Sequence, residues 1–199
     1  WRLDRNPLPQ LTYPSGQDQQ QDPRARFFRG FGGTVFPGTY TVSLFLGNVN
    51  SSSRLKVNPD PRMSVPDIEA LRKNYDRAVT FGSGIDVLNA KLRNLVTVRE
   101  SLTKTEKLIS EHPDFAAAVS EEYKAVKEEL AKLDEVFGRR QEGLTARISS
   151  YRSLVTASGT LTEQEEKVIT DAEAALAEAM KITDTFLDGS WARYKTKLK

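Results

Sequence analysis

The side chains best suited to metal binding or nucleophilic catalysis are scarce in this sequence. His112 is the only histidine, and there is no cysteine. A thiolate zinc site and a cysteine nucleophile are therefore excluded, and a transition-metal site would need carboxylates alone around His112. No Ser-His-Asp arrangement can be built on one histidine in a turn such as "EHPDF". We predict that His112 is a solvated residue of a turn between helices.

Adjacent glutamates are a second type of candidate, because paired carboxylates can act as acid and base in catalysis. Hydrolysis of a glycosidic bond needs two carboxylates held roughly 5–10 Å apart across a cleft that fits a sugar. Neighbouring glutamates on an exposed helix more often interact with water and with nearby lysines. The sequence therefore predicts no catalytic, cofactor-binding or metal residues, no cofactor, and no enzymatic activity within this chain. The pairs are Glu121/Glu122, Glu128/Glu129 and Glu165/Glu166.

Two glycine-rich stretches do not match phosphate-binding loops. "RGFGG" at Arg29–Gly33 lacks the lysine and hydroxyl of a phosphate loop and does not open a helix. We interpret it as a flexible approach to a strand. "FGSGID" at Phe81–Asp86 has no strand before it, as a dinucleotide fingerprint requires. It is expected to kink or break a helix.

The composition limits the possible partners. The 199 residues carry a net charge of +2, with 38% hydrophobic and 28% charged residues. Such a charge does not indicate binding to nucleic acid, and no apolar run approaches the roughly 18 residues of a membrane span. We expect a protein partner, no nucleic acid and no membrane insertion. Because residue 1 is tryptophan, we also expect the chain to be a processed or trimmed piece of a longer protein.

The first third of the chain has the features of a small sheet. Pro37-Gly38 predicts a turn, and the β-branched and aromatic residues of Thr39–Leu46 predict a strand. "SSSRLKVNPD", centred on Leu55 and Val57, predicts a partner strand joined through a loop at residues 47–50. Trp1–Asn6, "WRLDRN", can form a further short strand. The proline- and glutamine-rich stretch from about residue 7 to 26 is predicted to be a long exposed loop.

From Ser64 onward the hydrophobic pattern has the period of helices. Apolar residues at 3–4 spacing predict a helix from Pro66 to Glu111, interrupted at Gly82–Gly84. Similar patterns predict helices over 115–137 and 144–155. Thr162 and Glu165 match a capping box that opens a last helix, which Gly189 can break. The predicted fold is α+β but mostly α: a short antiparallel β segment followed by an elongated antiparallel bundle of three or four long helices.

The order of these segments resembles a known family. "WRLDR" at Trp1–Arg5, "PGTYTV" at Pro37–Val42 and "DPR" at Asp60–Arg62 are followed by "LTARISSYRSLVTASGTLTEQEEKVITDAEAAL" and "DGSWARYKTKL". Together they resemble the C-terminal region of bacterial sortilin-like, BNR-repeat β-propeller proteins, often labelled glycosyl-hydrolase-like. In that family a propeller precedes an Ig-like sandwich and a helical region. Trp-Arg-Leu-Asp here replaces the commoner Trp-Asp-Leu.

The resemblance implies two domains and a role in docking. Residues 1–62 would be a partial Ig-like β segment, and residues 63–199 a coiled-coil-like helical bundle. The chain would be a non-catalytic spacer and docking module of a secreted, cell-surface or periplasmic propeller protein. Its partner would be the upstream propeller or Ig-like portion, or another chain that completes the sheet. An alternative is an accessory domain of a glycosidase-like hydrolase with its active site in an upstream propeller; a third is a free-standing coiled-coil adaptor.

Two groups of residues are candidates for such contacts. With the upstream strands absent, some aromatic residues of the β segment are expected to face a partner. Asp60, Pro61 and Arg62 are expected to form a structured hinge between the sheet and the first helix. The candidate partner-facing residues are Trp1, Phe27, Phe28, Phe31, Phe36 and Tyr40.

Overall fold

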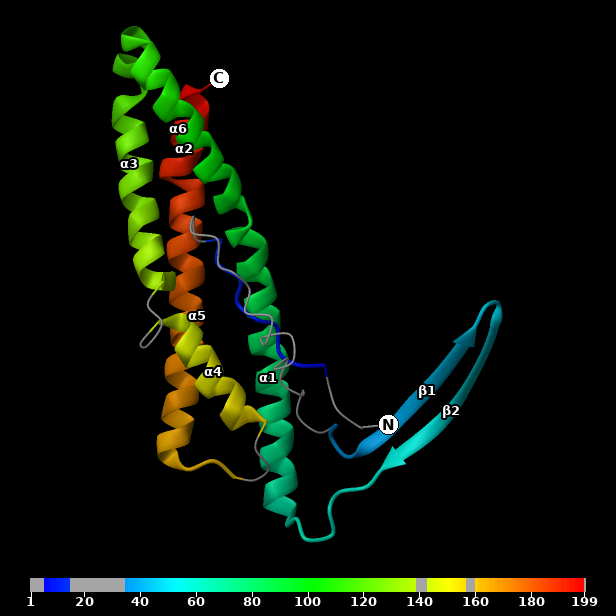
Figure 1. Ribbon diagram of the computed structural model, residues 1–199. Coiled ribbons are helices and arrows are strands. Elements are labelled where there is room, and N and C mark those ends of the chain that lie inside the picture. Colours follow the sequence, from blue (N-terminus) through cyan, green and yellow to red (C-terminus); the bar gives the residue numbers. More distant parts are fainter. Residues whose placement is uncertain (1–5, 15–34, 139–142, 157–159, 199) are drawn as a thin grey trace.

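The computed structural model describes residues 6–14, 35–138, 143–156 and 160–198 (Figure 1). The predicted fold class is confirmed: the chain is α+β and mostly helical, and the described residues contain a two-stranded antiparallel sheet. In chain order the elements are β1 (Gly38–Leu46), β2 (Val49–Val57), α1 (Val65–Leu92), α2 (Asn94–Glu111), α3 (Pro113–Gly138), α4 (Leu144–Val155), α5 (Glu163–Asp188) and α6 (Ser190–Lys197).

The helices form an elongated bundle of three rods that run up, down and up (Figure 1). The first rod is α1 followed by α2, the second is α3 followed by α4, and the third is α5 followed by α6. The sheet lies at the side of the bundle near the start of α1 and points away from it. The bundle therefore has its own core, and the hairpin is an appendage to it.

The interior of the bundle is made by the apolar residues that recur at helical spacing. Phe81, Ile85, Leu88 and Leu92 of α1 are buried, and their ridge continues into α2 through Leu95. The other rods contribute buried residues at the same helical spacing. These include Val126, Leu130, Leu133 and Phe137 of α3, Leu144, Ile148, Tyr151 and Val155 of α4, and Ile169, Ala172, Leu176, Ala179 and Phe186 of α5. Each helix buries one stripe and exposes the rest, as in helical bundles generally.

Two capping boxes fix where helices begin. Ser64 caps α1: its side chain accepts from the backbone N–H of Asp67, whose carboxylate accepts from the backbone N–H of Ser64. Thr162 and Glu165 make the same reciprocal pair at the start of α5, as the sequence predicts. Such boxes satisfy backbone donors that have no partner in the first helical turn.

The break in the first rod is not where the glycines predict it. Gly82 is buried and Gly84 half-buried inside an uninterrupted α1, and the helix ends instead at Arg93. A β-carbon on Gly84 would lie 3.0 Å from the Cδ2 of Leu176, and one on Gly82 would lie 3.1 Å from the Cδ2 of Leu8. The two glycines are thus sites of close packing, where a side chain would crowd a neighbouring segment.

The hairpin is tighter than predicted. Its turn has only two residues, Gly47 and Asn48, and the ladder continues to the pair of Leu46 with Val49. Gly47 has φ of 56°, a left-handed conformation that favours glycine in two-residue hairpin turns. The predicted four-residue loop is therefore wrong, because Val49 and Asn50 belong to the second strand.

The first described part of the predicted exposed loop has no helix or strand, as predicted, but its large apolar side chains are not exposed. Residues 6–14, which we name the strap, lie along the bundle, and Leu8, Leu11 and Tyr13 pack against its core. The prolines exclude the strap from a sheet, but they leave its apolar side chains free to contact the helices. Residues 15–26 of the predicted loop lie outside the described residues, as do residues 1–5 of the strand expected at 1–6.

Candidate docking surface

The hairpin has one apolar face that extends from its base to its tip. The cross-strand pairs place Tyr40 opposite Leu55, and Leu46 opposite Val49, on the same side. Val42, Leu44 and Val57 belong to this face because side chains alternate along each strand. On β2 it also carries two small polar residues, Ser51 opposite Leu44 and Ser53 opposite Val42. The opposite face carries mostly polar residues, namely Thr39, Thr41, Ser43, Asn50, Ser52, Arg54 and Lys56, together with Phe45.

Burial of the apolar face decreases toward the tip. Val42, Leu55 and Val57 are half-buried, whereas Leu44, Leu46 and Val49 have exposed fractions of 70%, 77% and 69%. Phe45 on the polar face is also exposed. A continuous exposed group of large apolar side chains marks an interaction site more often than scattered ones do.

Both long edges of the hairpin are available for pairing. Among the described residues, β1 pairs only with β2, so each strand has an outer edge whose backbone groups have no ladder partner. An unpaired edge is a template for the strand of another sheet. A two-stranded hairpin is also marginally stable by itself in water, so a covering sheet would stabilise it.

Only the base of the hairpin approaches the helices. The ring of Phe36 lies 6.4 Å from that of Tyr75 on α1, and the guanidinium of Arg72 lies 5.8 Å from the Phe36 centroid. The Tyr40 hydroxyl donates to the backbone oxygen of Phe36. Of the predicted partner-facing residues, the structure thus places Phe36, half-buried, at the junction with the bundle.

Tyr40 is the other predicted partner-facing residue that can be located. It has an exposed fraction of 36% and lies on the apolar face. Trp1, Phe27, Phe28 and Phe31 lie outside the described residues. Sequence reasoning missed Leu44, Leu46 and Val49, although the strict alternation of Tyr40, Val42, Leu44 and Leu46 could have identified one apolar face.

Asp60, Pro61 and Arg62 form an ordered turn between β2 and α1. The Asp60 carboxylate accepts from the Arg62 backbone N–H at 2.9 Å, from its Nε at 3.0 Å and from its terminal nitrogen at 2.7 Å. These hydrogen bonds hold the pKa of Asp60 below its usual value. The Met63 N–H also donates to the Asp60 carbonyl at 2.9 Å. The segment therefore sets the direction in which the hairpin leaves the bundle.

Each glutamate pair has a member in a structural contact: Glu122 pairs with Lys197 at 3.4 Å, and Glu129 accepts from the Ser190 hydroxyl at 2.6 Å. Glu166 binds Lys73 at 2.8 Å and Arg77 at 2.5 Å, tying α5 to α1, while Glu165 caps α5. The hydrogen bonds from Lys73 and then Arg77 lower the pKa of Glu166. His112 is exposed at the turn between α2 and α3.

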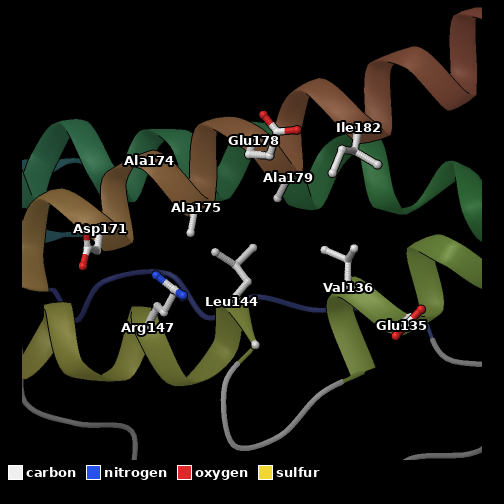
Figure 2. A pocket seen from close by; sticks show the side chains of 11 residues that line it. Glu135, Val136, Leu144, Arg147, Asp171, Ala174, Ala175, Glu178, Ala179 and Ile182 are labelled. Carbon is white, nitrogen blue, oxygen red and sulfur yellow. The ribbon is translucent and has the colours of Figure 1, made fainter.

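One groove on the described part of the bundle is mostly apolar. It has a volume of about 700 Å³ and lies between α5, the end of α3 and the start of α4 (Figure 2). Leu144 and Val136 point across it toward Ala175, Ala179 and Ile182, while the carboxylate of Glu178 points away. Arg147 and Asp171 lie at one end. The groove offers an apolar surface rather than converging polar groups.

A second groove, of about 490 Å³, lies between α1 and α5. Phe81, Leu176 and Met180 contribute to its lining, and two of its three charged residues, Arg77 and Glu173, pair with each other at 3.1 Å. The described residues contain no cluster of three or more potential metal ligands, and none of their helices is long and apolar enough to cross a membrane. Comparison with protein families, curated proteins and solved structures finds no match.

Proposed function

We propose that this chain is a non-catalytic docking and spacer module that binds a β-sheet of its partner through the hairpin. The observation that carries this proposal is the apolar hairpin face, which is half-buried at the base but open at Leu44, Leu46 and Val49. The partner sheet would belong to another part of a longer polypeptide or to a separate chain. The resemblance to propeller-associated Ig-like regions supports this reading and a location outside the cytoplasm.

The geometry permits two kinds of contact with such a partner. A second sheet can pack on the apolar face at the roughly 10 Å spacing of stacked sheets. A strand can also add to an outer edge of β1 or β2, where main-chain hydrogen bonds would supply affinity. The first contact accounts for the apolar face, because strand addition alone does not require one side to be apolar.

The bundle would act as the spacer. Its three rods bury their own stripes against one another, so its core is complete without the hairpin. The ordered turn at residues 60–62 would transmit the position of the docked hairpin to α1. In this arrangement the partner fixes the base of the rod, and the far end carrying α6 projects from it.

The proposal can be tested with single thiols, because the natural chain has no cysteine. Leu46→Cys places a thiol on the open apolar face, and Ser43→Cys is the matched control on the polar face of the same strand. Reaction with a maleimide polymer is compared between the purified chain and the protein in its native host. Docking predicts that Cys at 46 is protected about tenfold or more in the host, while Cys at 43 remains reactive. Equal reactivity at position 46 in both settings would refute it.

A further inference from the structure

The strap, residues 6–14, is held by the bundle through its backbone. A terminal nitrogen of Arg152, on α4, donates to the carbonyl oxygens of Leu8 at 3.0 Å and Pro9 at 2.8 Å. Arg152 is half-buried, and burial lowers its pKa. A guanidinium in such a position requires hydrogen-bond acceptors, and the strap supplies two of them.

Asn89 of α1 forms hydrogen bonds to the next residues of the strap through both the nitrogen and the oxygen of its side-chain amide. Its Nδ2 donates to the Gln10 carbonyl, and its Oδ1 accepts from the Thr12 backbone N–H, each at 2.8 Å. Arg99 of α2 then donates from Nε to the Pro14 carbonyl at 3.0 Å. Three helices thus contribute one polar side chain each, and together these contact five backbone groups of the strap. Contacts of this kind recognise an extended chain independently of its side chains.

Side-chain contacts add selectivity at both ends of the strap. Leu8 and Pro9 approach the face of α1 at Gly82, where a β-carbon would lie 3.1 and 3.2 Å from them. At the other end the Tyr13 ring stacks on Phe137 with centroids 4.7 Å apart, and its hydroxyl donates to Asp134 at 2.5 Å. Arg99 also binds Asp134 and so holds that carboxylate in place. A phenylalanine at position 13 would lose the hydroxyl contact.

The strap itself forms no helix or strand. Three of its nine residues are prolines, which favour extended backbone and lower the entropy lost on binding. Five of its backbone groups therefore bond to side chains of the bundle, as backbone groups of a bound peptide do to its receptor.

We propose that the bundle surface beneath the strap is a binding site for an extended, proline-containing peptide of the pattern Leu-Pro-x-Leu-x-Tyr, with residues 8–14 as its resident ligand. This surface, which we name the strap site, is formed by Gly82, Asn89, Arg99, Asp134, Phe137 and Arg152. The proposal is independent of the hairpin function, since it involves a different face and different residues. Because the resident segment is tethered, its effective concentration excludes a competing free peptide.

The test weakens the contact of the strap with the bundle by substitution, so the full chain is kept. The triple variant Leu8→Ser, Leu11→Ser and Tyr13→Ser removes the strap's apolar anchors. A fluorescent peptide of sequence NPLPQLTYP is titrated against this variant and the natural chain, and its anisotropy is measured. The variant is expected to bind the peptide at least about tenfold more tightly than the natural chain, because the tethered competitor is weakened.

Two controls define the specificity. The peptide NPSPQSTSP should not bind the triple variant. Adding Asn89→Leu to the triple variant should weaken binding of NPLPQLTYP about tenfold. A variant that keeps the natural helical circular dichroism but fails to bind the peptide would overturn the proposal. Loss of the helical signal in the triple variant would overturn it as well, because the strap would then be part of the core rather than a ligand.

Discussion

The rings of Phe81 on α1 and Tyr151 on α4 stack with centroids 3.8 Å apart and planes inclined by 15°. Both residues are buried, so this contact joins the first rod to the short helix of the second at the centre of the bundle. Aromatic pairs contribute beyond the area that they bury. The Tyr151 hydroxyl also donates to a carboxylate oxygen of Glu173 on α5 at 3.5 Å, so the third rod contacts the same aromatic pair.

Phe81→Ala should therefore lower the free energy of unfolding by about 3–5 kcal/mol, the usual loss when a buried phenylalanine is truncated. Urea denaturation followed by circular dichroism measures the change. Val79→Ala, at an exposed position of the same helix, is the control and should change stability by less than about 0.5 kcal/mol. A loss below about 1 kcal/mol for Phe81→Ala would contradict the central packing position of this ring.

Gly82→Ala tests the close contact between α1 and the strap. Helix propensity alone predicts that alanine stabilises α1 by about 1 kcal/mol. The new β-carbon would instead crowd Leu8 and Pro9, so we expect the strap to be displaced. Hydrogen exchange should then become faster at the Thr12 amide, which donates to Asn89.

The control for this crowding is Ser83→Ala, at the exposed position next to Gly82. It should leave exchange at the Thr12 amide unchanged. If Gly82→Ala also leaves that amide as protected as in the natural chain, the strap does not pack on α1 as described.

The same glycines show what the sequence could and could not predict. The helices were predictable because each apolar stripe repeats at 3–4 spacing and because Ser64 and Thr162 carry recognisable caps. The break at Gly82–Gly84 was predicted from propensity, which describes an isolated helix. In the folded chain, close packing of Leu8 and Leu176 favours glycine at these positions, and this contact joins segments far apart in the sequence.

The candidate site was only partly predictable for a similar reason. The hairpin strands followed from composition, and their register then fixed which residues share a face. The exposed tip at Leu44, Leu46 and Val49 depends on how far the hairpin extends beyond the helices, which no local pattern encodes. The strap was missed because its contacts with Asn89, Arg99 and Arg152 span 77 to 144 residues of sequence.

Thr162→Ala should remove the cap of α5. The threonine side chain accepts from the Glu165 N–H, and its loss leaves that donor without its helix-end partner. We expect a loss of about 1 kcal/mol in the free energy of unfolding. Thr170→Ala is a matched control on α5, because the Thr170 hydroxyl only donates to the Glu166 carbonyl one turn earlier. Equal effects of the two substitutions would exclude a capping role for Thr162.

Glu166→Gln tests the charge contacts between α1 and α5. Glu166 accepts from Lys73 and Arg77, which hold its pKa below the ordinary value of 4.5. A carboxyl group whose pKa is lowered by folding contributes stability that is fully present above its unfolded pKa and is lost as the pH falls through the folded one. The natural chain should therefore exceed Glu166→Gln in stability at neutral pH, and the difference should decrease below pH 4.5 and vanish once the pH is below the folded pKa.

The difference at neutral pH should be about 0.5–1 kcal/mol, since partly exposed ion pairs are screened by solvent. Urea denaturation of both proteins at about pH 7 and about pH 3 measures this stability difference with the Glu166 carboxyl ionised and protonated, respectively. Glu178→Gln, at an exposed position of the same helix, is the control and should change stability at neutral pH by less than about 0.5 kcal/mol. A gap for Glu166→Gln that stays constant between the two pH values would mean that shape or hydrogen bonding, rather than charge, accounts for the effect. The contacts with Lys73 and Arg77 would then add no electrostatic stability.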